Sequence, residues 1–422
     1  MSHDDVYEWR LCMRKLISTL CIICLVLLIP TIIRVQSILP LNNHALVEKK
    51  YEGWSGVLRV WVYEGWKPGI GSTSSWLNQC ISTFEKKHEG VYVQPQYVDA
   101  SALETLGENG VIPPDMILFP PGLLNTPAHL LPIESTYDLL EGLQHSGDYG
   151  GFTYAVPVAM GGYLWAYNTN MLTSLPDTWS DADLDISAPI DDNYHQWGAA
   201  LLSLCSGRYL ADQEDADTRD SVPLGDVDLG LESISETPVP TSTPEPSADS
   251  LLPCQLPADF TFSETAYTDF VNGTLAAVPV SQREVYRLQA LSDQGKGPDW
   301  QLAQSGSAAF TDQILFIAIV DRQDAQAQQE LSHQFIDHLL SNDCQSTLSK
   351  VSAFSVTSAA SGYAAYDALC TMEIALKAPG LMAPCAFGMQ WKQSVEIIVR
   401  QFTEGDRDAW ALLPQLSAAL SQ

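Results

Sequence analysis

The chain has 422 residues, 46% of them hydrophobic, which is enough to build the cores of two or three ordinary domains. Its 51 Asp and Glu residues outnumber its 21 Lys and Arg residues, and the formal net charge is -30. This acidity would repel nucleic-acid phosphates and anionic lipid surfaces, so we expect no nucleic-acid partner. A strongly charged, solvated surface also suits an exposed compartment.

Residues 1–37 are predicted to carry the chain into a membrane. The run from Leu16 to Ile33 is uncharged, almost wholly apolar and just long enough to span a bilayer, and basic residues precede it. A cytoplasmic tail with a retained transmembrane anchor and a cleaved signal peptide share this pattern, and the VQS stretch at 35–37 fits cleavage. We therefore expect the folded part to be extracytoplasmic, anchored at the cell membrane or, if the signal is cleaved, secreted.

A polar spacer over 38–56 leads into a segment with the pattern of an α/β domain. The sequence predicts a buried strand over Val57–Tyr63, a helix over Ser72–Lys87 and an alternating strand over Val91–Val98. A short buried strand follows over Met116–Phe119, with proline-rich turns on both sides. The order strand, helix, strand, strand favours a largely parallel sheet.

The middle of the chain changes character after two more strand-like runs, Tyr154–Val158 and Gly162–Tyr167. Residues 211–250 hold eleven acidic residues, one basic residue and five prolines. Such a composition cannot bury enough apolar area to offset the entropy lost on ordering. We predict a disordered, acidic, Pro-rich insertion over 211–250.

Regular structure is expected again beyond the insertion. A helix passes through Ala266 and Phe270, a strand covers Thr274–Val280, and a second helix covers about Glu284–Leu291. The remaining predicted elements are a buried strand over Leu315–Val320 and helices over Ala325–Leu340, Tyr363–Leu376 and Gln393–Phe402.

Catalytic and cofactor motifs are absent from the sequence. It contains no Gly-x-Ser-x-Gly, His-Glu-x-x-His, P-loop or complete Gly-x-Gly-x-x-Gly motif, so no catalytic residue, metal ligand or cofactor is assigned. A glycosidase needs only two carboxylates that face each other across a cleft. Glu64, Asp115 and Glu284 are the first candidates for such a pair, although a surface or structural role is favoured for each of them.

Six cysteines lie beyond the membrane segment, where an oxidising compartment would allow disulfides. Six cysteines permit fifteen pairings, so the sequence does not fix the bridges. Cys205 with Cys254 would close the acidic insertion, and Cys370 with Cys385 would close a short loop. Metal ligation is the weaker alternative, because no Cys-x-x-Cys lies among them.

Aromatic residues gather at the ends of predicted strands. Tyr63, Glu64 and Trp66 directly follow the first strand, and ligands of open α/β sheets lie outside the carboxyl ends of strands. Aromatic faces suit carbohydrate or other flat, partly apolar ligands. In the run Gly162–Tyr167, the side chains of Tyr163 and Trp165 share one face of a strand, where core packing and cleft lining are equally compatible with the pattern.

Several stretches resemble one protein family when they are taken in order. VLRVWVYEGW, FEKKHEGVYVQPQYV, PPDMILFPPGLL and TYAVPVAMGGYLWAYNTNML resemble segments of the family 1 extracellular solute-binding proteins of ABC importers. FVNGTLAAVPV and HQFIDHLLSNDCQSTLSKVSAFSVT are similar to later segments of that family. Each motif is loose by itself, and the resemblance depends on their collinear order across most of Val57 to Leu413.

The resemblance implies a two-lobed α/β fold of the periplasmic-binding-protein type, in which each lobe is a mixed sheet flanked by helices. The chain would cross between the lobes near Val158 and again near Gln304. On this basis lobe 1 comprises 57–158 and 305–360, and lobe 2 comprises 159–304 and 361–422, with the 211–250 insertion inside lobe 2.

The resemblance further implies a monomeric, non-enzymatic receptor without a cofactor. It would capture a small polar ligand, expected to be a carbohydrate, between its lobes and deliver it to ABC permease subunits in the membrane. The ligand-binding positions carried over are Tyr63, Glu64, Trp66, Tyr163, Trp165, Ser281 and Arg283. For Arg283 the alternative of a plain surface cation stays open.

Two departures from the family support a different function, and one of them is the absence of a lipobox at the membrane segment. The acidic insertion stands where the second lobe normally carries a longer folded stretch. The alternative is therefore a binding-protein-like sensor or scaffold of a membrane complex, without a transport role.

Overall fold

The structure is a computed structural model, and it separates into the units Met1–Trp54 and Ser55–Gln422. Nearly all of the described residues belong to the second unit. The structure describes 54–106, 112–175, 187–189, 261–304, 311–322, 325–358, 362–363, 366–378, 381 and 383–388, with isolated residues between 393 and 401.

The predicted membrane segment and the acidic insertion lie outside these described residues, as does most of the predicted helix over Gln393–Phe402. Within the part of the chain that is described, no helix is both long and apolar enough to cross a membrane.

The larger sheet belongs to lobe 1 and has the strand order β2-β1-β3-β12-β6. β1 pairs in parallel with β2 and β3, whereas β12 is antiparallel to both β3 and β6. The sheet is therefore mixed, and the expectation of a largely parallel sheet holds only for its first three strands. Their bounds are β1 Gly56–Val62, β2 Val91–Tyr97, β3 Met116–Phe119, β6 Val156–Met160 and β12 Ile314–Ile319.

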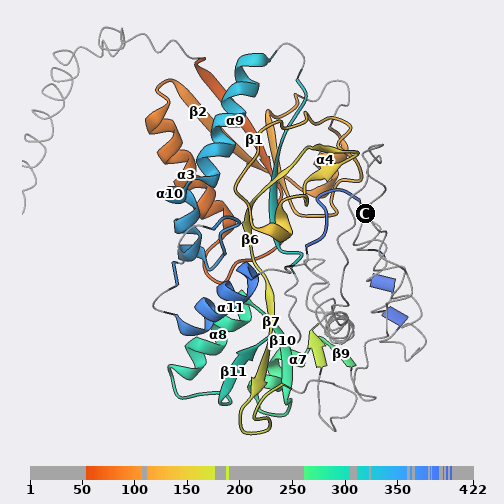
Figure 1. Cartoon of the computed structure of the whole chain (residues 1–422), viewed down its shortest axis with the longest axis vertical. Coiled ribbons are helices and arrows are strands. Elements are labelled where there is room, and N and C mark those ends of the chain that lie inside the picture. The colour runs from red at the N-terminus through yellow and green to blue at the C-terminus, as the bar shows by residue number, and fades with distance from the viewer. Residues whose placement is uncertain are drawn as a thin grey trace, which may run out of the picture. The chain divides into compact units, whose positions relative to one another are not determined.

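Two helices pack against this sheet and against each other (Figure 1). α3 (Thr73–Lys87) contacts β2, and α9 (Gln326–Leu340) contacts β12 and β6. Each helix turns an apolar face inward, and Phe84 of α3 meets Phe335 of α9 edge-on with ring centroids 5.0 Å apart. The central strands β3 and β12 are buried along their whole length, which explains their unbroken apolar sequences.

The smaller sheet belongs to lobe 2 and has the strand order β10-β7-β11, with both pairs antiparallel. Helices α7 and α8 pack on β10, and α11 packs on β11 and α8 (Figure 1). The bounds are β7 Tyr163–Asn168, β10 Ala277–Ser281, β11 Trp300–Ala303, α7 Ala266–Val271, α8 Gln282–Ser292 and α11 Asp367–Lys377.

Some predicted boundaries differ from those observed. β10 begins at Ala277 rather than at Thr274. The chain is still in the turn after α7 at this point, because Gly273 adopts a left-handed φ of 76° and the Thr274 amide donates to the Asp269 carbonyl. α11 begins at Asp367 rather than at Tyr363. The Tyr363 hydroxyl instead donates to the Ala353 carbonyl across 2.6 Å, which fixes this residue outside the helix.

Short elements complete the described chain, and the sequence patterns predicted none of them. They are α4 (Ala100–Glu104), α10 (Asn342–Gln345), the 3-10 helices η1 (Glu141–Leu143) and η4 (Ser346–Val351), and the strands β4 (Asp148–Tyr149), β5 (Phe152–Thr153), β8 (Ser187–Pro189) and β9 (Thr261–Ser263).

The chain leaves lobe 1 at Gly161 and Gly162, between β6 and β7, and returns between β11 and β12. After α11 it makes further contacts with lobe 1. Phe387 forms a parallel bridge with Leu124, and the Ala386 amide donates to the Ser146 carbonyl. This short stretch therefore lies on lobe 1, although residues 361–422 were expected in lobe 2.

Candidate functional site

The loop after β1 carries the first three predicted ligand-binding residues. Tyr63 is half-buried and its amide donates to the Leu118 carbonyl at 2.9 Å, which continues the pairing of β1 with β3. Trp66 is buried, with 3% of its surface exposed. Its Nε1 is buried and has no hydrogen-bond partner among the described residues.

Glu64 is exposed and turns toward the amino end of α3. Its Oε1 accepts hydrogen bonds from the Ser74 amide and from the Thr73 hydroxyl, each at 3.1 Å, and from the Ser74 hydroxyl. A carboxylate in this position satisfies free amide groups of the first turn and complements the helix dipole. Glu64 thus has a structural role as a capping group.

The same loop contacts the end of η4 in lobe 1 and comes close to the start of α8 in lobe 2. The Ile70 amide donates to the Val351 carbonyl at 3.2 Å, and a Cβ added at Gly69 would lie 2.6 Å from the Cβ of Ser352 and 3.3 Å from the carbonyl oxygen of Gln282. Gln282 is the first residue of α8, directly after β10. Loops that follow strands of both lobes therefore meet at this point.

Tyr163 and Ser281 lie opposite each other on β7 and β10. The Tyr163 hydroxyl donates to Asp312 Oδ1 at 3.0 Å, and burial, followed by the neighbouring carboxylate, raises the pKa of Tyr163 well above its usual value. The phenol is therefore a neutral donor at physiological pH. Trp165 has no exposed surface and is part of the core of lobe 2.

Ser281 caps α8 and holds the start of that helix in place. Its amide donates to Glu284 Oε2 at 3.1 Å, and its hydroxyl accepts from the Arg283 amide at 3.3 Å. Arg283 is half-buried on the first turn. The structure thus brings Tyr163, Ser281 and Arg283 to one end of the small sheet. This end of the sheet approaches the loop after β1 at one point, where Gly69 lies next to Gln282 at the start of α8.

A buried polar junction lies where the chain crosses between the lobes, and sequence reasoning missed it. Gln282 Oε1 accepts from the Gly162 amide at 3.0 Å, and its Nε2 donates to Gln313 Oε1 at 2.5 Å. The Thr311 hydroxyl donates to the Gly161 carbonyl at 2.8 Å. Gln282 and Thr311 have no exposed surface, so their polar groups depend on these contacts.

The only signal for this junction in the sequence was the Gly161-Gly162 pair. A Cβ at Gly161 would lie 2.4 Å from Gln282 Nε2, and a Cβ at Gly162 would lie 2.4 Å from Leu376 Cδ2 of α11. Only glycine allows the backbone to approach these side chains so closely. The two glutamines are far apart in sequence, and only the folded chain shows that they pair.

The three carboxylates considered for a glycosidase are all engaged in structural contacts. Glu64 caps α3, and Glu284 caps α8 together with Ser281. Asp115 is 2% exposed and accepts from the Arg59 amide at 2.7 Å while it pairs with Arg322. Among the described residues, no group of three or more His, Cys, Asp or Glu side chains is arranged to hold a metal ion.

No protein-family model matches the chain, and no curated protein matches its sequence. Solved structures do match. The GacH receptor of Streptomyces glaucescens GLA.O, studied unliganded and with acarbose, is 14% identical with a TM-score of 0.53, over 87% of this chain and 98% of that chain. The maltodextrin-binding protein MalE1 of L. casei BL23 is 12% identical with a TM-score of 0.54, over 88% of this chain and all of that chain.

A family 1 extracellular solute-binding protein of Bifidobacterium longum subsp. infantis matches equally well, at 15% identity and a TM-score of 0.53, over 87% of this chain and all of that chain. At this level of identity the likeness establishes the fold. The chain has the two-lobed α/β fold of the periplasmic-binding-protein type, as the collinear motifs predicted.

Proposed function

We propose that this chain is an extracytoplasmic receptor that captures a small carbohydrate between its two lobes for an ABC importer. The observation that carries the proposal is the meeting of the loop after β1 with the start of α8, at Gly69 and Gln282. The loop after β1 follows the carboxyl end of a strand with parallel neighbours, where α/β folds place their ligands, and the start of α8 faces it. The likeness to sugar-binding receptors favours a sugar as the ligand.

The proposed contact residues have the chemistry that a sugar requires. Tyr63 offers an aromatic face, Trp66 offers an indole N–H, and Glu64, Ser281 and Arg283 offer hydrogen-bonding groups. Tyr163 supplies a neutral phenol next to Ser281. Trp165 would act from the core, by holding β7 and therefore Tyr163 in position.

The proposed receptor would work at the membrane, next to its permease. Residues 1–37 would hold it at the membrane or direct its secretion, and a permease would receive the ligand from the closed lobes. We propose that no chemical conversion takes place. The structural engagement of Glu64, Asp115 and Glu284 supports this, because a glycosidase needs two carboxylates aimed into the cleft.

The test is a titration of the full chain with maltotriose, longer maltodextrins and acarbose. Tryptophan fluorescence and the melting temperature are the readouts, and we expect a saturable change in both. Arg283→Ala should weaken binding about tenfold, as expected for the loss of one charged hydrogen-bonding group. Arg287→Ala is the matched control, because Arg287 is an exposed residue one turn further along α8.

A sensor or scaffold role is the second candidate, and the burial of the aromatic residues favours it. Only 3% of Trp66, 4% of Tyr163 and none of Trp165 is exposed, so these rings pack within the protein. A chain that melts cooperatively but responds to none of the sugars in fluorescence or melting temperature would support this role and contradict sugar capture.

A further inference from the structure

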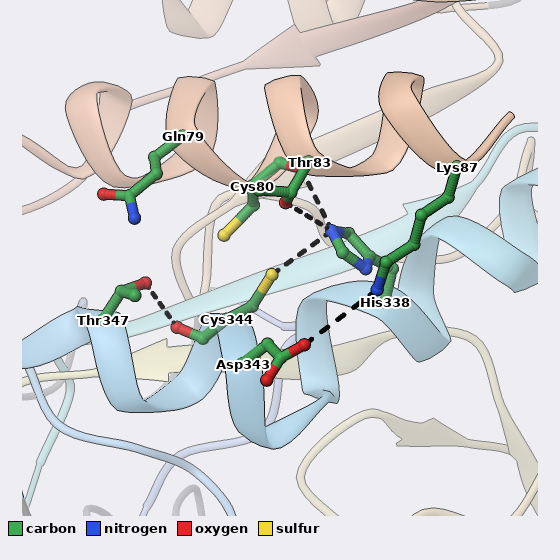
Figure 2. Close-up of a pocket in the computed structure, with 8 residues that line it drawn as sticks. All are labelled: Gln79, Cys80, Thr83, Lys87, His338, Asp343, Cys344 and Thr347. Carbon is green, nitrogen blue, oxygen red and sulfur yellow. Dashed lines mark hydrogen bonds and ion pairs between the residues drawn. The ribbon is translucent and has the colours of Figure 1, made fainter. Parts of the chain in front are cut away.

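Two buried cysteines in lobe 1 face the same cavity, which has a volume of about 220 Å³. Cys80 lies on α3 and Cys344 lies on α10, and they are 1% and 3% exposed. Figure 2 shows the two sulfur atoms pointing toward each other across the space between the helices. No function described above uses this pair.

His338, on α9, holds the two cysteines in a common hydrogen-bond network (Figure 2). Its Nε2 lies 3.0 Å from the Cys80 carbonyl oxygen, 2.9 Å from Thr83 Oγ1 and 3.4 Å from Cys344 Sγ. A carbonyl oxygen can only accept, so Nε2 carries the proton. Cys344 Sγ lies within reach of the same ring nitrogen, so His338 links Cys344 to the backbone of Cys80.

Charged residues stand at the rim of the cavity. Lys87 and Asp343 line it and form an ion pair with a separation of 4.0 Å, and their side chains are 58% and 86% exposed. These exposures place the rim of the cavity beside solvent. Among the described residues, no set of three or more ligating side chains is arranged for a metal, so covalent pairing suits the thiols better than metal ligation.

We propose that Cys80 and Cys344 form a reversible disulfide that joins α3 to α10 within lobe 1. The oxidant is a small disulfide of the glutathione type. The Cys344 thiolate attacks one of its sulfur atoms, forms a mixed disulfide and releases one thiolate. Cys80 then loses its proton and attacks Cys344 Sγ, which releases the second thiolate. Overall, two cysteine thiols and one small disulfide give one protein disulfide and two small thiols.

The environments of the two thiols fit this order of attack. Hydrogen bonding with Cys80 is the main factor that lowers the pKa of Cys344, and the same interaction, together with burial, raises the pKa of Cys80. Cys344 is therefore the attacking group. Once Cys344 has become a mixed disulfide, its negative charge is gone and the main factor that opposes ionisation of Cys80 has been removed.

The disulfide would brace the loop after β1 from two sides. α3 holds this loop through Glu64 at its amino end, and η4, which directly follows α10, holds it through the contact of Val351 with Ile70. A covalent link between α3 and α10 would fix both supports relative to each other. The inference does not depend on sugar binding, because the two cysteines belong to lobe 1 alone.

The experiment uses the full chain in buffers that contain reduced and oxidised glutathione in varied ratio. After an alkylating quench, peptide mass spectrometry should find Cys80 linked to Cys344 in the oxidising buffers and both residues alkylated in the reducing ones. Oxidation should raise the melting temperature by about 5 °C. In Cys80→Ser, whose hydroxyl can still donate to Cys344, Cys344 should retain glutathione as a mixed disulfide, which would identify it as the attacking thiol.

Cys370→Ser is the matched control, because this half-buried thiol lies on α11 in lobe 2 and should leave the link intact. Recovery of Cys80 and Cys344 as two alkylated thiols in every buffer would overturn the proposal. So would their linkage to other cysteines, or protection of both thiols by added zinc without formation of the link. The mapping is done on the unaltered chain, so a variant that fails to fold does not prevent the test.

Discussion

At the scale of single residues, Asp115 is a buried charge with two partners. It accepts from the Arg59 amide of β1 and pairs with Arg322, which follows β12, so one carboxylate ties the central strands together. Asp115→Ala should lower the free energy of unfolding by about 2–4 kcal/mol, because it leaves a buried donor and a cation without their acceptor. Asp115→Asn should cost less, because its amide oxygen can still accept from Arg59.

Urea unfolding checks the prediction for Asp115, with Glu89→Ala as the control. Glu89 is exposed, and its loss should change the free energy of unfolding by less than about 0.5 kcal/mol. If Asp115→Ala unfolded at the same urea concentration as the unaltered chain, the carboxylate would have no role in joining the strands.

His338 should make stability depend on pH. Burial lowers the pKa of this imidazole, so the unfolded chain binds a proton more readily than the folded chain does. The stability that the neutral ring contributes is present above about pH 6.5 and is lost as the pH falls through and below that value. His338→Gln should therefore lose less stability than the unaltered chain between pH 7 and pH 5.

Urea midpoints at several pH values measure this difference between the chain and its His338→Gln variant. His129→Gln is the control for the substitution itself, because His129 is an exposed histidine away from the residues around His338. Equal losses in the chain and in both variants would show that His338 does not contribute to acid sensitivity.

At the scale of elements, the amino end of α3 is capped from two sides. Ser72 Oγ accepts from the Ser75 amide at 3.2 Å, and Glu64 accepts from the Ser74 amide. Ser72→Ala and Glu64→Ala should each lower the free energy of unfolding by about 0.5–1 kcal/mol. Only Glu64→Ala should also weaken sugar binding, because Ser72 is not among the proposed ligand contacts.

Parallel urea and fluorescence titrations of the two variants separate capping from ligand contact. Unchanged stability in Glu64→Ala would remove its capping role. Equal sugar affinity in both variants would remove Glu64 from the proposed binding site.

The elements that the sequence predicted most closely are those with local signals. β3 matched the prediction over Met116–Phe119, since prolines bound its apolar run on both sides, and α3 began one residue after the predicted Ser72, which is its cap. β11 was missed, because WQLA is short, only half-buried and carries no alternation. It is a strand because β7 pairs with it, and that pairing exists only in the folded chain.

The candidate site was harder to predict than the fold. Alternation correctly placed Tyr163 and Trp165 on one strand, β7, but it could not show whether Trp165 faces the cleft or the core. Its burial depends on β10 and β11, which flank β7 and come from more than a hundred residues further along the chain. Gln282 and Gln313 carried no local signal either, because nothing in the sequence around a single glutamine indicates its partner.

At the scale of the whole molecule, the two lobes share a junction that is polar and fully buried. Gln282 connects the start of α8 with the crossing at Gly162 and with Gln313 before β12. A buried amide network of this kind favours one arrangement of the two lobes at the junction. Displacing either lobe there would leave buried polar groups without hydrogen-bond partners. We therefore expect the lobes to move about this junction rather than to separate at it.

Ligand binding should then make the molecule more compact through hinge closure. With a sugar at saturating concentration, small-angle scattering of the full chain should show a smaller radius of gyration than without it. Gln282→Ala leaves the Gly162 amide without its acceptor, so it should destabilise the fold by about 1–3 kcal/mol and weaken this compaction. If fluorescence reports a bound sugar and the scattering curves with and without it superimpose, the ligand binds without closure. The junction would then be a rigid support rather than a hinge.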